Sequence, residues 1–244
     1  MRSEEFISTL FNSAKELGGV EVLQKGVPLG VDAAGGIVLS QKHDGPKLFR
    51  HTCVAGVKRS VFIRRMLISL SCLYEKEDAE FLVLSPHLAY SEILRLKNID
   101  ATIPYIREKS DLEQAKESLK ALLQMRSTGA GYPRLIIVLD GLDELPECNK
   151  NKDLEEYREF LELVSRQENV EIISGVDLMQ SIFSGYPGSF VGIGNCLVST
   201  REEGKADVTY VNDDTSLSQP TPMNFPDSPS VVESVIFLNA VPRG

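Results

Sequence analysis

Three short apolar runs in this sequence are continuous rather than alternating, and they limit the possible folds more than any other feature. They occupy residues 81–85, 135–140 and 170–174. Continuous apolar strands are typical of a parallel sheet that is covered on both faces. Helical stretches with apolar stripes stand between them, as crossover connections between parallel strands require. The sequence therefore predicts an α/β fold with helices on both faces of a mainly parallel central sheet.

The remaining elements follow from apolar periodicity and turn residues. We expect one large domain over residues 27–240, preceded by a helical segment 1–26 and followed by a short tail 241–244. The domain opens with a small hairpin at 27–40, and residues 212–230, rich in proline, form an irregular connector. The predicted strands are 47–55, 79–85, 134–140, 170–174, 189–198 and 207–211. The predicted helices are 5–18, 61–73, 112–125, 154–164 and 231–240.

Composition excludes several classes of protein. The 244 residues carry a formal net charge of −9, so the chain as a whole is not a typical nucleic-acid binder, although residues 42–65 are strongly basic. Its apolar runs all fall well short of the ~20 residues that cross a bilayer, and the first residues lack a secretory signal pattern. The four cysteines form no CxxC pair, which argues against a zinc or redox motif. We expect a cytoplasmic protein that does not insert into membranes.

The strongest chemical motif is the apolar strand that ends in Asp140. Such a Walker B pattern places a carboxylate at the carboxyl edge of the sheet, where nucleotide phosphates and Mg²⁺ bind in open α/β folds. Asp143 and Glu144 follow closely, and either could orient a water molecule. A central buried strand followed by a solvated acidic turn would give the same pattern, and this reading stays open.

A Walker A loop should precede the first helix, but the sequence there departs from the GxxxxGK[ST] pattern. Gly56, Lys58, Arg59 and Ser60 keep the order of glycine, basic residue and hydroxyl. No second glycine stands before the basic residue, so the backbone cannot easily turn its amides toward a phosphate. Arginine also replaces the compact ammonium of lysine with a larger planar group. A catalytic phosphate loop is therefore not expected.

Taken in order, these motifs resemble the motor domain of the FtsK/SpoIIIE/HerA family, which comprises DNA translocases and related secretion ATPases. The resemblance extends over residues 27–240. It covers an opening segment, the strand before the phosphate loop, a second strand, the Walker B strand, and a closing strand and helix. The matching stretches are 27–38, 45–49, 54–56, 60–63, 81–87, 103–105, 136–145, 204–210 and 230–237.

The departures from the family pattern fall where the chemistry would take place. About three residues of the phosphate loop are missing between Gly56 and Lys58. The Asp-Pro-Lys that follows the family's second strand is Ser-Pro-His at 85–87, and the sensor stretch at 174–178 lacks its glutamine and arginine. The Walker B acid Asp140 is retained. The resemblance thus implies a RecA-like three-layer α/β/α P-loop fold that has lost ATP hydrolysis.

The first hypothesis is a catalytically degenerate module with a structural or regulatory role in a DNA-translocation or secretion assembly. It needs no cofactor, and it implies protein partners or self-association, with DNA as a possible partner. The second is an active ATPase motor, with Gly56 and Lys58 or Arg59 on the phosphates, Ser60 and Asp140 on Mg²⁺, and Asp143 or Glu144 on the attacking water. The third is a NACHT-type (STAND) nucleotide switch, because the string at 136–145 also occurs in that class.

Overall fold

The structure is a computed structural model of the chain. It describes residues 20–41, 50–87, 90–91, 93–100, 108–128, 131–141, 169–176, 196–201, 204–212 and 216–225. The predicted helices 5–18, 154–164 and 231–240 lie outside these residues. The described helices are α2 (Val20–Lys25), α3 (Arg59–Leu73) and α4 (Lys109–Thr128), with a short 3₁₀ helix η2 (Ile93–Arg95).

The described strands form one sheet in the order β2-β1-β9-β8-β7-β3-β6-β5-β4. Five of them, β7, β3, β6, β5 and β4, run parallel to one another, and β1, β2, β8 and β9 join by antiparallel pairing. The bounds are β1 (Pro28–Val31), β2 (Ile37–Leu39), β3 (His51–Ala55), β4 (Ala79–Leu84), β5 (Arg134–Asp140), β6 (Val170–Val176), β7 (Cys196–Thr200), β8 (Lys205–Tyr210) and β9 (Thr221–Asn224).

The sheet is more mixed than the sequence predicts. The hairpin β1–β2 does not stand apart from the main sheet, because Val31 of β1 pairs with Asn224 of β9. Strand β9 lies within the segment 212–230 that we expected to be irregular, and it pairs with β8 through residues 221–224. The closing strand is also displaced, since β8 covers 205–210 rather than 207–211. The parallel core of the prediction is confirmed, and the antiparallel flank is an addition to it.

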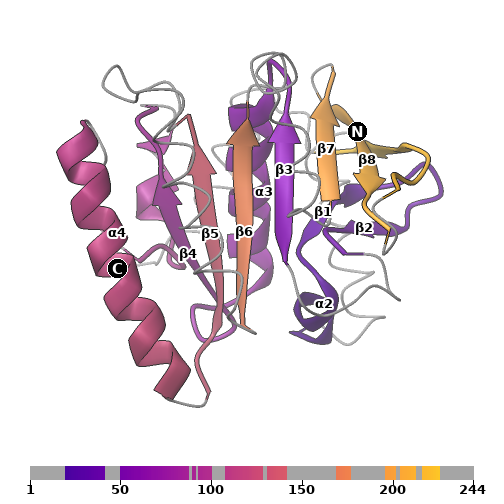
Figure 1. Ribbon diagram of the computed structural model, residues 1–244. Helices are drawn as coiled ribbons and strands as arrows, with labels where there is room; N and C mark the ends of the chain where they lie inside the picture. The colour runs from indigo at the N-terminus through magenta and orange to yellow at the C-terminus, as the bar shows by residue number, and fades with distance from the viewer. Residues whose placement is uncertain are drawn as a thin grey trace.

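The parallel strands bring the candidate residues to one edge. Strand β6 lies between β3 and β5, with Ala55 paired to Val176 and Asp140 paired to Gly175. Because parallel strands end at the same edge, the turn after β3 and the carboxylate that ends β5 face the same side of the molecule. Figure 1 shows the arrowheads of β3, β5 and β6 at this shared edge.

Helix α3 covers one face of the sheet and carries the main core. It contacts β1, β3, β6 and β7, and Figure 1 shows it behind the central strands. Phe62 and Leu67 of α3 are fully buried and pack in one cluster with Val54, Ile136 and Ile173 of the strands. Burying a side chain of this size contributes about 1.5–3 kcal/mol. This packing fixes the first turn of α3 against the carboxyl edge.

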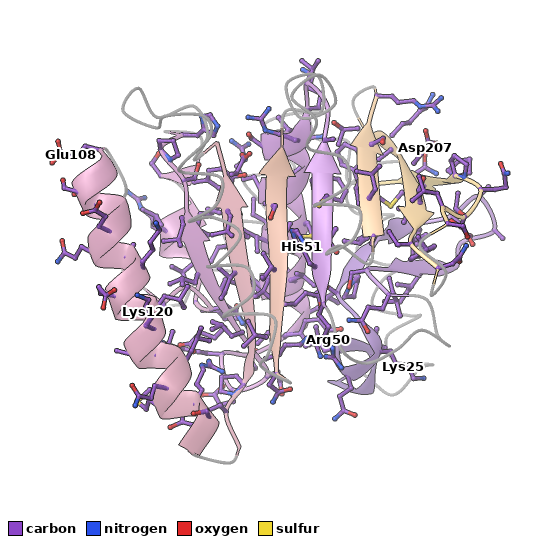
Figure 2. All side chains as sticks on the ribbon, viewed as in Figure 1. Lys25, Arg50, His51, Glu108, Lys120 and Asp207 are labelled. Carbon is purple, nitrogen blue, oxygen red and sulfur yellow. The ribbon has the colours of Figure 1, made fainter. Side chains whose placement is uncertain are left out.

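The polar side chains of Asn98 and Arg126 hold the elements around β4 together. The buried amide of Asn98 donates hydrogen bonds to the carbonyl oxygens of Tyr74, Glu75 and Ala79, and so closes the turn between α3 and β4. Arg126 of α4 binds Glu80 of β4, with 2.6 Å between Nη2 and Oε2. Helix α4 lies next to β4 in Figure 1; in Figure 2, Lys120 projects from α4, and Glu108 lies directly before its first residue.

Candidate functional site

The connection from β3 to α3 is a tight turn of three residues, Gly56 to Lys58. The backbone N–H of Arg59 donates to the carbonyl of Gly56 at 3.1 Å, which closes the turn on itself. Val57 at its tip is 95% exposed. The turn therefore projects as a compact corner at the carboxyl edge.

The end of β7 braces this turn. Gly56 has a φ of +105°, and a Cβ at this position would lie 2.4 Å from the carbonyl oxygen of Thr200. The Thr200 hydroxyl donates to the carbonyl of Ala55 at 2.9 Å. Only glycine fits here, because a side chain would meet both backbone strain and a fixed neighbouring carbonyl. The space next to the turn is thus filled by β7.

Asp140 is the centre of the candidate site. Its side chain is fully buried, and Arg59 Nε donates to Oδ1 at 2.9 Å. The Ser60 hydroxyl donates to Oδ2 at 2.5 Å, and the Tyr90 hydroxyl donates to the same oxygen at 2.8 Å. Both carboxylate oxygens therefore accept hydrogen bonds, and one partner carries a permanent positive charge.

Two glycines make room for this arrangement. A Cβ on Gly175 of β6 would lie 1.9 Å from Asp140 Oδ1, so the carboxylate rests directly over the glycine backbone. Gly141 follows Asp140 with a φ of +73°, and a Cβ there would lie 2.1 Å from His87 Nε2. The absence of side chains at Gly175 and Gly141 therefore leaves the space that the Asp140 carboxylate and the His87 imidazole occupy.

Tyr90 is a permanent donor in this cluster. Burial raises the pKa of its hydroxyl well above the usual value, and the negative charge of Asp140 and the hydrogen bond to it raise the pKa further. The hydroxyl therefore stays protonated, as its bond to the carboxylate requires. Together with Arg59 and Ser60, Tyr90 ties β5 to α3 and to the segment after β4.

The structure places most of the predicted site residues. It brings Arg59, Ser60 and Asp140 together, and it places Gly56 and Lys58 in the adjoining turn, with Lys58 exposed. The predicted catalytic acids Asp143 and Glu144 lie outside the described residues. Within the described part of the chain, His, Cys, Asp and Glu side chains form no group of three that could hold a metal ion.

Tyr90, Gly175 and Thr200 belong to the site, although none of them was among the predicted site residues. Tyr90 is 50 residues from Asp140 in the sequence and comes from a segment without regular periodicity. Gly175 could have been noticed as a glycine at the end of an apolar strand, where a close approach is a common reason for glycine. Thr200 has no such signal, because its role depends on the strand order.

Comparisons with known proteins identify the fold. No protein-family model and no curated protein matches the sequence. The structure is similar to the cytoplasmic domain of the type VII secretion ATPase EccC of Thermomonospora curvata, with a TM-score of 0.59 and 11% identity. It is also similar to ATPases 2 and 3 of EssC from Geobacillus thermodenitrificans, with a TM-score of 0.56 and 14% identity over 83% of this chain and 41% of EssC. A protein described only as an ATPase gives a TM-score of 0.59 at 10% identity.

The lengths of these proteins differ from that of the chain. The match to EccC covers 84% of this chain but only 26% of the EccC chain, so this chain spans about a quarter of the length of EccC. By contrast, the match to the protein described as an ATPase covers 86% of the chain and 93% of that protein. A fourth structure contains ATPases 2 and 3 of EccC from Thermomonospora curvata in complex with a signal sequence peptide, with a TM-score of 0.57 at 12% identity. In the described part of the chain, no helix is both long and apolar enough to cross a bilayer. The chain has a mixed α/β fold that is similar to the fold of these ATPase domains.

Proposed function

We propose that this chain is a non-hydrolysing, FtsK/SpoIIIE-like module that serves a secretion-type assembly in the cytoplasm through protein contacts. The closed three-residue turn at Gly56–Lys58 is the observation that carries this proposal. A phosphate loop of the GxxxxGK[ST] type surrounds the phosphates with backbone N–H groups. Here the N–H of Arg59 is bonded to Gly56 within the turn, and Thr200 fills the space beside it.

The residues present do not fit Mg²⁺-ATP. The basic side chain that would bind phosphate, Arg59, is bonded instead to the Walker B carboxylate of Asp140. The hydroxyl that would bind Mg²⁺, on Ser60, donates to the same carboxylate. These contacts use the charge and donors that a bound nucleotide would need, so we derive no hydrolytic step from this site.

Proteins rather than DNA are the proposed partners. The chain carries a net charge of −9, and two arginines of its basic segment are withdrawn from the surface. Arg65 is only 4% exposed, and Arg59 is paired with Asp140. DNA affinity depends on basic side chains that reach phosphates. The EccC structure with a signal sequence peptide provides a precedent for a protein ligand on this fold.

Titration calorimetry with Mg²⁺-ATP tests the proposal, together with a phosphate-release assay. We expect neither binding heat nor phosphate release from the intact chain, and Asp140→Asn should behave in the same way. Micromolar binding that Asp140→Asn abolishes would overturn the proposal. The same titration tests the two alternatives, because an active motor and a nucleotide switch both bind nucleotide. DNA binding at about 50 mM salt that falls steeply with added salt would contradict the choice of partner.

A further inference from the structure

The Asp140 carboxylate needs a positive charge, and the chain supplies one itself. A buried carboxylate without a partner is very unfavourable, and such groups are paired or coordinate metals. Asp140 is fully buried, and its paired cation is the guanidinium of Arg59, whose side chain is 14% exposed. Because arginine cannot lose its proton in a protein, this compensation is present at every pH at which the fold survives.

The other hydrogen-bond partners of the Asp140 carboxylate are hydroxyl oxygens. The hydroxyls of Ser60 and Tyr90 both lie within 2.8 Å of Asp140 Oδ2. Carboxylate and hydroxyl oxygens are the donors that Mg²⁺ and Mn²⁺ prefer. A divalent cation at Asp140 would have to displace Arg59 or share the carboxylate with a like charge next to it.

We infer that Arg59 is a built-in counter-ion that occupies the position of a divalent cation, and that removing its charge opens a cation site formed by Asp140 and Ser60. The inference extends the proposed function, since it explains why the intact chain needs no Mg²⁺ at this edge. It also assigns Arg59 a role in holding the first turn of α3 on β5. The cluster is then fixed in one state, whatever the concentration of magnesium.

Mn²⁺ alone is the probe, and electron paramagnetic resonance of free Mn²⁺ measures binding without any assay of activity. The intact chain should bind no Mn²⁺ at 1 mM, and Arg59→Ala should bind one ion per chain with a submillimolar dissociation constant. Arg59→Ala combined with Asp140→Asn should lose this binding. Lys58→Ala is the matched control, because it removes a neighbouring positive charge that does not contact Asp140.

Each outcome decides the question. Mn²⁺ binding by the intact chain or by Lys58→Ala to the same extent would overturn the inference, as would folded Arg59→Ala that binds none. Arg59→Gln is the second variant if Arg59→Ala does not fold, because glutamine keeps a donor without the charge. Refolding of either variant by Mn²⁺ supports the inference, and failure of both to fold at saturating Mn²⁺ refutes it. ATP hydrolysis by the intact chain would refute only the proposed function.

Discussion

Replacing Gly175 with alanine should disrupt the Asp140 cluster, although the residue itself makes none of its hydrogen bonds. The added Cβ would lie 1.9 Å from Asp140 Oδ1, 2.5 Å from its Cγ and 3.0 Å from its Cβ. The carboxylate cannot turn away without leaving the donors on Arg59, Ser60 and Tyr90. The alternative is a backbone shift between β5 and β6, which would disturb the ladder at their ends.

The expected loss of stability follows from these contacts. Overpacking a filled interior costs about 1–3 kcal/mol, and losing a hydrogen bond to a buried charged group costs about 1.5–3 kcal/mol. Alanine recovers about 0.5–1 kcal/mol relative to glycine in a strand. Gly175→Ala should therefore lower the free energy of unfolding by about 2–5 kcal/mol.

Urea unfolding followed by far-ultraviolet circular dichroism measures this change, because the chain contains no tryptophan. Gly131→Ala is the matched control: its Cβ would meet nothing within 4 Å, and only its φ of +86° opposes the substitution. Asp140→Ala removes the clashing oxygen, so the double variant should be more stable than the sum of the two single effects predicts, by at least about 1.5 kcal/mol. Equal losses for Gly175→Ala and Gly131→Ala, or strict additivity with Asp140→Ala, would refute the reasoning.

Two further substitutions test the surrounding structure. Asn98→Ala removes the amide that donates to the carbonyl oxygens of Tyr74, Glu75 and Ala79, so urea unfolding should show a loss of about 2–4 kcal/mol, and a loss below about 1 kcal/mol would contradict this role. Burial lowers the pKa of His51 from 6.5 to about 4, so the native state keeps the imidazole neutral while the unfolded chain binds a proton as the pH falls below 6.5. Stability should fall by about 2.5 kcal/mol between pH 7.5 and 4.5 from this group alone. His51→Gln can keep a hydrogen bond to Ser174 and should lose this part of the pH dependence, whereas identical pH profiles would show that His51 does not contribute.

Three of the five parallel strands, β4, β5 and β6, could be predicted well because their environment leaves a simple pattern, whereas β7 covers 196–200 and the predicted strand was 189–198. Strand β5 has the predicted bounds 134–140, β4 begins where expected at Ala79, and β6 extends two residues beyond the prediction. All seven residues of β5 are buried, and burial on both faces gives the continuous apolar run from which it was predicted. His51 begins the neighbouring strand β3, and Figure 2 shows it among the central strands. A polar residue at this position does not interrupt the strand.

Strand β9 could not be predicted, because its sequence argues against a strand. Proline lacks the N–H that a central strand donates, and Pro222 stands in the middle of β9. The structure resolves the conflict through pairing, since β9 meets β1 only at the Asn224–Val31 pair. Pro222 therefore pairs with β8 on one side and with no residue of β1 on the other. Its position is thus equivalent to that of a residue in an edge strand. Sequence reasoning cannot supply this information, which depends on where the N-terminal hairpin docks.

The candidate site was only partly predictable for a related reason. Asp140 and Ser60 follow from motif patterns, but the partner of Arg59 depends on how far the turn after β3 lets the side chain reach. The short turn lets Arg59 reach Asp140 across β6. A longer loop would instead hold its basic residue over a ligand. If the proposed function holds, the loss of the phosphate loop after β3 and the retention of Asp140 have one explanation. A buried carboxylate that loses its metal must be replaced or neutralised, and the 2.9 Å bond from Arg59 neutralises it without any change in β5.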